Sequence, residues 1–171
     1  AASDVYKRQL IKELDQNSKL DHYTKIQLSK LTAPNGKANL SVYVYVPENL
    51  KNFQKDVTLR NRITKEQYEL TDEGAAVSEK TAALLDLKAG DELILKKDDR
   101  EYQVKIAVIT ENYAGHYVYM TPNVYKETFG EDPDYADIVF AVRDEYKDQT
   151  ESIGQKIMES PAVLSISYTA S

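Results

Sequence analysis

His116 is the residue whose chemistry is easiest to anticipate, because Glu111 lies close to it in the chain. A histidine near a carboxylate can act as an acid–base pair. The sequence supplies neither a nucleophile nor the third member of a catalytic triad beside these two residues. An ordinary loop histidine between two strands is therefore the favoured interpretation.

Three aspartates, Asp132, Asp134 and Asp137, are the second candidate, since Ca²⁺ prefers clustered carboxylates. Their spacing does not match the EF-hand loop, and Pro133 stiffens the segment. A solvated acidic loop is favoured over a calcium site. The other histidine, His22, lies far away in the sequence, and two distant histidines without cysteine make a weak case for zinc.

Ser78 is the third candidate, and a nucleophilic role for it lacks both a GxSxG context and a partner base. A helix cap is the favoured role for this serine. The chain contains no GxGxxG and no GxxxxGK[ST] pattern, so nucleotide binding has no sequence support. We therefore expect no catalytic, cofactor-binding or metal-binding residues and no enzymatic activity.

Tyrosine is the commonest aromatic residue of this chain, which has 13 tyrosines, 3 phenylalanines and no tryptophan. Tyrosine combines a large contact area with a polar tip, which suits recognition of a partner. Half-buried strand tyrosines are the alternative, and they are slightly favoured. The candidate contact residues are Tyr43, Tyr45, Tyr113, His116 and Tyr117, with Tyr119 beside them.

The bulk composition indicates a globular domain. The chain has 171 residues, of which 42% are hydrophobic and 29% charged, and it is long enough to bury a core. The net charge of −6 argues against a nucleic-acid groove. Cysteine is absent, which excludes disulfides and thiolate metal sites. No apolar run approaches the roughly 20 residues that span a bilayer.

The middle of the chain is rich in strand signals. Residues 40–46, LSVYVYV, alternate strictly between apolar and polar positions, which predicts a strand. Residues 74–97 predict a helix capped by Ser78, a turn at Gly90 and a second strand, which a hairpin turn joins to residues 101–110. Residues 121–130, TPNVYKETFG, predict a helix with Thr121 as its cap and Gly130 as its stop.

Shorter signals complete this middle region. Pro47 is expected to start a short helical turn, and the segments DVTLRN and EQYEL predict two short strands around a turn at residues 63–65.

The two ends of the chain carry the remaining elements. Residues 4–15 predict a helix that Asp4 caps, and a strand follows it. Residues 137–169 predict a strand, a helix and a closing strand whose Leu164, Ile166 and Tyr168 face inward.

We therefore predict an α+β fold with a mixed β-sheet, a terminal β-α-β unit and an inserted β-rich lobe. The first helix and strand are expected to pack on the last unit, so that residues 1–35 and 126–171 form one lobe and residues 36–125 form the other.

Residues 74–130 carry a resemblance to a known family. Their order of "LLxLKxGD", "ENYxGHxxYM" and "TPxxYxxTFG" resembles the extracytoplasmic domain of FtsX-like permeases, the membrane subunits of MacB-type ABC transporters, in a version typical of Gram-positive bacteria. The segments LTAPNGKANLSVYVYVPENL and LSISYTAS also fit this pattern. The resemblance thus covers nearly the whole chain.

The resemblance implies a two-lobed domain on the extracellular face of the cell membrane, held by transmembrane helices of the same permease. One lobe lies near the membrane and the other is distal. The family's ATPase is a separate cytoplasmic subunit, and the outer domain of the family carries no catalytic residues.

Three functions remain open from the sequence. The first is a permease ectodomain that couples cytoplasmic ATP hydrolysis to export, to peptide sensing or to the control of an envelope partner. The second is a ligand-binding module for a peptide, lipid or lipoprotein. The third, an envelope hydrolase, lacks any visible triad, dyad or metal set.

Overall fold

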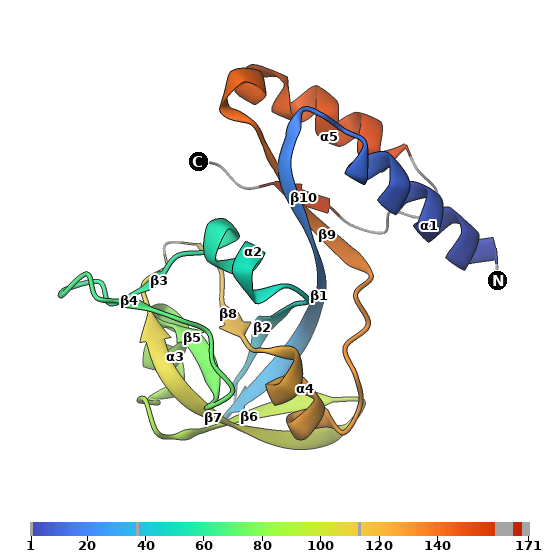
Figure 1. The fold of residues 1–171 in the computed structure, drawn as a ribbon. Coiled ribbons are helices and arrows are strands. Elements are labelled where there is room, and N and C mark those ends of the chain that lie inside the picture. Colours follow the sequence, from blue (N-terminus) through green and yellow to red (C-terminus); the bar gives the residue numbers. More distant parts are fainter. Residues whose placement is uncertain (1, 37, 113, 160–165, 169–171) are drawn as a thin grey trace.

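A computed structural model describes residues 2–36, 38–112, 114–159 and 166–168 of the chain (Figure 1). The five α-helices are α1 (Ala2–Asp15), α2 (Leu50–Asp56), α3 (Glu79–Leu85), α4 (Pro122–Phe129) and α5 (Thr150–Met158), with a 3₁₀ turn, η1 (Asp144–Gln149), before the last. The strands are β1 (Leu20–Asn35), β2 (Ala38–Pro47), β3 (Leu59–Arg60), β4 (Gln67–Tyr68), β5 (Ala75–Ser78), β6 (Glu92–Lys97), β7 (Arg100–Thr110), β8 (Tyr117–Tyr119), β9 (Asp137–Val142) and β10 (Ile166–Tyr168). The predicted α+β class is confirmed.

The main sheet closes on itself. Its strand order is β10-β9-β1-β2-β8-β5-β7-β6, and β6 also pairs with β1 at Thr32 and Lys96. Strands β1, β2, β8, β5, β7 and β6 therefore form a small barrel, which removes the exposed edges that an open sheet would have. The β2–β8, β5–β7 and β9–β10 pairs are parallel and the others antiparallel, so the prediction of a mixed sheet is correct.

Strand β1 belongs to two parts of the sheet. From Leu20 to Ile26 it pairs with β9, and from Ile26 to Asn35 it pairs with β2 of the barrel. Its 16 residues make it the longest strand in the described part of the chain. The division into lobes at residues 35/36 and 125/126 stays a prediction.

The barrel interior is filled by the apolar side of its strands. Val42, Val44 and Val46 of β2 are fully buried there, as the strict alternation of residues 40–46 predicts. Helix α4 adds Tyr125 and Phe129 to the same core. A second core lies outside the barrel wall, between β2, β8, α2 and the segment that carries β3 and β4.

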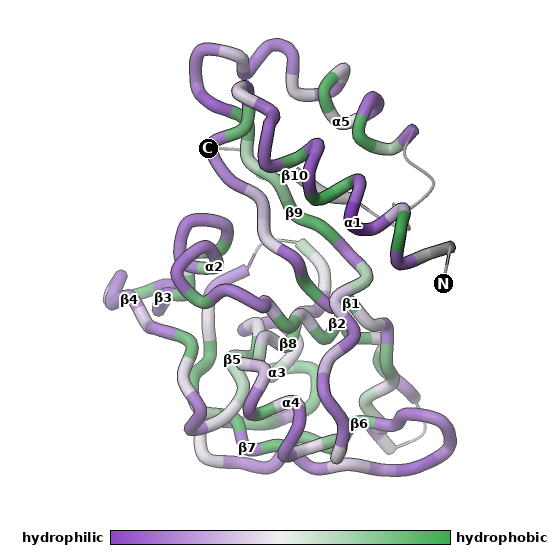
Figure 2. The backbone as a smooth tube through the Cα atoms, turned by 45° about the vertical axis from the view of Figure 1, so that its right-hand side comes forward, coloured by the Kyte–Doolittle hydropathy of each residue, from purple (hydrophilic) through white to green (hydrophobic). Residues whose placement is uncertain are grey.

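The third core lies under the two terminal helices. Leu10 and Leu14 of α1 and Ile153 and Ile157 of α5 pack on Phe140 of β9. Figure 2 shows β9 as a largely apolar segment beside α1 and α5, both of which alternate apolar and polar positions. The parallel β9–β10 pair confirms the predicted β-α-β unit. The expected inward side chains at positions 164, 166 and 168 lie outside what the structure describes.

The ends of the short helices test the predicted caps. Thr121 Oγ1 accepts from the N–H of Val124, and Gly130 ends α4 with φ of 76°, so both predictions for this helix are confirmed. Helix α2 begins after Asn49, whose side chain accepts from Asn52 N, and not at Pro47, which is the last residue of β2.

Helix α1 already begins at Ala2, so Asp4 lies in its first turn and the predicted cap at Asp4 is wrong. Ser78 occupies the predicted cap position of α3, although its side chain makes no capping hydrogen bond. Gly90 lies in a turn as predicted, and Asp86, with φ of 55°, ends α3 before it. Asp and Asn tolerate this left-handed conformation better than other non-glycine residues.

Both predicted hairpins are present. Asp98 and Asp99, with φ of 50° and 63°, form the turn between β6 and β7. Strands β3 and β4 pair for two residues each and form an arm that projects from the body of the molecule (Figure 1). The longest helices in the described residues are too short and too polar to cross a membrane.

Candidate functional site

Four tyrosines form a row on the outer face of the barrel. The parallel β2–β8 register places Tyr43 beside Tyr117 and Tyr45 beside Tyr119. Ring centroids are 5.6 Å apart for Tyr43–Tyr117, 5.6 Å for Tyr117–Tyr119 and 5.4 Å for Tyr45–Tyr119. Such spacings are typical of favourable aromatic pairs. We call these four residues the tyrosine ladder.

The tyrosine ladder runs from the surface into the second core. Tyr43 is 37% exposed and Tyr117 is half-buried, whereas Tyr45 and Tyr119 are each only 7% exposed. Phe53 of α2 covers the inner pair, at centroid distances of 5.7 Å from Tyr45 and 5.6 Å from Tyr119. Tyr45 and Tyr119 were therefore wrong as contact residues, because α2 covers the face that alternation alone leaves open.

The hydroxyl groups of Thr81 and Ser78 connect His116 with Tyr117, at the outer end of the tyrosine ladder. Thr81 Oγ1 lies 2.9 Å from His116 Nδ1 and 2.5 Å from Ser78 Oγ, which accepts from Tyr117 N at 3.1 Å. Ser78 and Thr81 are completely buried, so neither hydroxyl can reach a substrate. This network joins α3, β5 and β8.

The alternative of an acid–base pair between His116 and Glu111, which the sequence disfavoured, is not what the structure shows: the two residues have other partners. Glu111 forms an ion pair with Arg60 at the base of the arm. Gly115 explains how the loop fits here: its φ is +75°, and a Cβ atom on it would lie 2.9 Å from the Tyr117 ring. The third loop candidate, Tyr113, lies outside the described residues. The candidates that remain at the surface form a patch of Tyr43, which is exposed, and of His116 and Tyr117, which are half-buried.

The acidic segment 132–137 is committed to structural contacts. Asp137 accepts from Leu28 N at 2.9 Å, and Asp132 pairs with Lys126 at 3.4 Å. The backbone N–H of Asp134 donates to Gln27. In the ranges that the structure describes, no three His, Asp or Glu side chains converge as metal ligands would.

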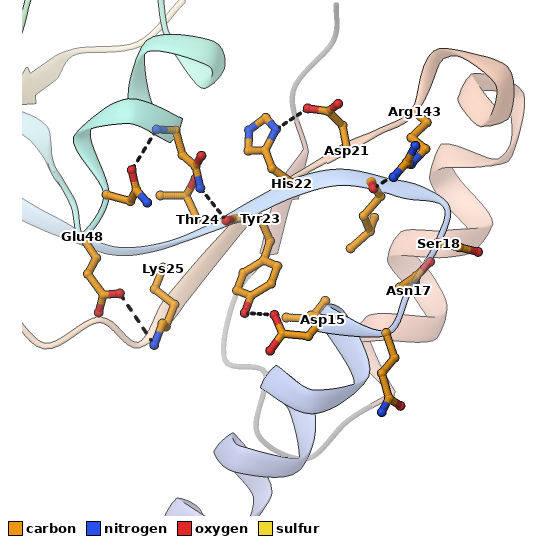
Figure 3. Close-up of a pocket in the computed structure, with 15 residues that line it drawn as sticks. Asp15, Asn17, Ser18, Asp21, His22, Tyr23, Thr24, Lys25, Glu48 and Arg143 are labelled. Carbon is orange, nitrogen blue, oxygen red and sulfur yellow. Dashed lines mark hydrogen bonds and ion pairs between the residues drawn. The ribbon is translucent and has the colours of Figure 1, made fainter.

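A pocket lies between the end of α1, the first half of β1 and α2 (Figure 3). Its volume is about 710 Å³ and its lining is mainly polar. Tyr23 donates to Asp15 at 2.6 Å, Arg143 donates to the carbonyl of Leu20 at 3.1 Å, and Lys25 lies 3.7 Å from Glu48. These polar groups of the pocket wall thus pair with one another.

His22 lines this pocket between Asp21, its neighbour in the chain, and the distant Asp56. Its Nδ1 lies 2.7 Å from Asp21 Oδ2, and its Nε2 lies 2.5 Å from Asp56 Oδ1. The hydrogen bond with His22 is the main cause that holds the pKa of Asp21 below its ordinary value. Asp56 is 34 residues from His22, so only the folded chain brings them together.

Burial changes the acidity of several tyrosines around these sites. It raises the pKa of Tyr45 and Tyr119 well above the ordinary value, because the ionised ring would lose its hydration. Burial and the hydrogen bond with Asp15 raise the pKa of Tyr23 to about 12. The hydroxyl of Tyr45 has no hydrogen-bond partner among the described residues.

The two histidines bridge elements of the fold. The hydroxyl groups of Thr81 and Thr24, which lie near His116 and His22 respectively, are buried. Tyr43, beside the half-buried His116 and Tyr117, is 37% exposed, and Ile63, at the tip of the arm, is 77% exposed.

Comparisons with known proteins identify the fold. It is that of the extracellular domains of ABC-type transporters. One solved structure with this fold is the extracellular domain of the noncanonical ABC-type transporter YknZ from Gram-positive bacteria, with a TM-score of 0.50 and 16% identity over 88% of this chain and 79% of that one. Another match is the periplasmic region of MacB from Actinobacillus actinomycetemcomitans, with a TM-score of 0.46 and 11% identity over 90% and 75% of the two chains.

At the level of sequence, no family model and no curated protein matches the chain. The structural match confirms the resemblance at the level of the fold.

Proposed function

We propose that this chain is the extracellular domain of an ABC transporter permease. In this proposal it couples ATP hydrolysis by a separate cytoplasmic ATPase to export, to peptide sensing or to the control of an envelope partner. The observation that carries the proposal is the shared strand β1, which pairs with β9 at one end and with the barrel at the other. The fold of the YknZ extracellular domain supports it.

The shared strand suits the transmission of displacement. At about 3.3 Å per residue, a strand as long as β1 extends over roughly 50 Å. Helices α1 and α5, near the two ends of the chain, pack on β9, the neighbour of β1. Packed interiors deform little, so a movement of these helices carries the barrel with it. The permease's own transmembrane helices, joined to both ends of this domain, would supply the movement.

The test of coupling uses the full-length permease with its ATPase in membrane vesicles. A flexible Gly-Ser segment inserted at each junction between the domain and the transmembrane helices leaves the fold intact and removes rigid transmission. We expect ATP hydrolysis to persist and the transport or signalling output to be lost. The same segment inserted between Asp98 and Asp99, an exposed turn, is the control and should leave the output unchanged.

Full output from a permease with both flexible junctions would refute the coupling proposal. Near-UV circular dichroism of the purified domain, which reports the packing of its tyrosines, shows whether each variant is folded. The full-length reading frame provides a separate test, since hydrophobic spans must flank this segment in a permease.

A ligand-binding module is the second candidate, and the patch of Tyr43, His116 and Tyr117 favours it. Exposed stacked rings offer contact area at low entropic cost. Titration of the chain with envelope peptides, lipid vesicles and lipoproteins tests this candidate. Binding that Tyr43→Ser weakens at least tenfold would support it. If none of the three binds, coupling remains as the single candidate function. In both candidates the domain itself catalyses no reaction.

A further inference from the structure

His22 lies between two carboxylates that belong to different elements. Asp21 neighbours it on β1, and Asp56 is the last residue of α2. The Asp56 side chain has no solvent exposure, and that of His22 is 10% exposed. The second oxygen of Asp56 accepts from Thr24 Oγ1 at 2.7 Å. Both oxygens of this buried carboxylate are thus held by side chains of β1.

The chemistry of the ring determines when this arrangement is favourable. An ionised carboxylate only accepts hydrogen bonds, and a neutral imidazole has one N–H group and one lone pair. Only the imidazolium ion donates to Asp21 and Asp56 at the same time. In the neutral ring one nitrogen lone pair faces a carboxylate oxygen at 2.7 Å or less, which is repulsive.

Other charged and titratable groups lie around the ring. The positive charges of Lys55 on α2 and of Arg143 after β9 stabilise the ionised form of Asp21, the exposed carboxylate. The Tyr45 hydroxyl of β2 lies near Asp56. Asp56, the buried one, has His22 as its partner across the contact with β1.

We propose that His22 is a proton-dependent latch that fastens α2 to β1. Proton uptake by the ring closes the latch, and proton loss loosens it. Helix α2 carries Phe53, which covers Tyr45 and Tyr119, and it leads into the arm. A change in pH would therefore adjust how α2 covers the second core. The latch is a property of the folded chain and does not rest on the proposed function.

His116 provides a matched control, because its ring contacts a hydroxyl group rather than two carboxylates. His116 Nδ1 lies 2.9 Å from Thr81 Oγ1, and a hydroxyl group can either donate to a ring nitrogen or accept from one. The contact of His116 with Thr81 therefore does not require the imidazolium ion, unlike the two contacts of His22.

The test is urea unfolding of the chain between about pH 8.5 and pH 5.5, the range in which histidines take up protons. The wild type is expected to gain stability as the pH falls, by at most about tenfold in the folded-to-unfolded ratio per pH unit for one proton. His22→Gln should abolish this gain and His116→Gln should keep it. An unchanged pH dependence in His22→Gln would overturn the proposal.

A spectroscopic measurement on the wild type covers the case in which His22→Gln does not fold. Long-range ¹H–¹⁵N spectra distinguish the two ring nitrogens of each histidine. At about pH 5.5 both nitrogens of His22 should show the shifts of protonated nitrogen, with α2 resonances changing over the same titration. A His22 ring that stays neutral throughout the range, or α2 resonances that do not follow it, would refute the latch.

Discussion

Removal of one hydroxyl group, in Tyr45→Phe, should stabilise this protein. The Tyr45 ring is 7% exposed and packs between Phe53 and Tyr119, and the substitution leaves that packing in place. Its hydroxyl is buried without a partner among the described residues. A buried polar group left unpaired costs about 1–3 kcal/mol. We therefore expect a gain of about 1 kcal/mol, which raises Tm by about 2–4 °C for a chain of this size.

Tyr125→Phe is the control, because this equally buried hydroxyl has partners. Tyr125 accepts from Gln27 Nε2 at 3.0 Å and from Lys97 Nζ at 3.1 Å. Its loss should cost about 1–3 kcal/mol. Urea and thermal unfolding followed by near-UV circular dichroism measure both variants. A Tyr45→Phe protein less stable than the wild type by 1 kcal/mol or more would show that the hydroxyl has a partner, and the reasoning would be wrong.

The same substitution has a consequence for alkaline stability. Burial raises the pKa of Tyr45, so the folded chain keeps this proton at pH values where the unfolded chain loses it. Stability from this group is complete below the ordinary tyrosine pKa of about 10 and is lost as the pH rises above it. Tyr45→Phe should therefore lose stability less steeply than the wild type above about pH 10, while Tyr119 still contributes.

Three further substitutions test the backbone and the caps by urea unfolding. Gly74→Ala places a Cβ atom 2.4 Å from the carbonyl oxygen of Lys105, so we expect the free energy of unfolding to fall by at least about 2 kcal/mol. A decrease below about 0.5 kcal/mol would mean that β5 and β7 can separate at little cost. Thr121→Ala removes the cap on Val124 N and should cost about 1–2 kcal/mol, and Thr121→Ser should recover most of it; equal losses in both variants would exclude the cap as the cause. Asp99→Gly relieves a left-handed residue with φ of 63° and should stabilise the chain by up to about 1 kcal/mol, whereas Asp99→Ala should not.

Local patterns predicted those elements whose signals are complete within a few residues. Residues 40–46 alternate in sequence, and the valines at 42, 44 and 46 are buried as this alternation predicts. Helix α4 begins at a Thr-Pro pair and ends at Gly130. Strand period, cap chemistry and turn conformation all act between near neighbours in the chain. Ser78 occupies the predicted cap position, but its hydroxyl bonds with Thr81 Oγ1 and with the N–H of Tyr117, a residue far away in the sequence, instead of capping α3.

The candidate sites depended on distant contacts, which no local pattern carries. Tyr43 and Tyr45 occupy equivalent positions in an alternating strand, yet α2 covers only Tyr45. His22 and Asp56 are each unremarkable in the sequence and meet only because α2 folds back on β1. The closure of β6 on β1 likewise joins segments that are far apart in the chain.

The position of His22 on β1 connects the latch with the proposed path of displacement. His22 lies in the part of β1 that pairs with β9, opposite Ala141, whereas α2 packs on the outer wall of the barrel. Its contact with Asp56 therefore links the two parts of the sheet at a second place besides the continuous backbone of β1. Because this contact helps to hold α2 on β1, the protonation of one ring adjusts how tightly α2 follows a movement of the strand. His22→Gln in the full-length permease should thus change the pH dependence of the output and leave ATP hydrolysis unchanged.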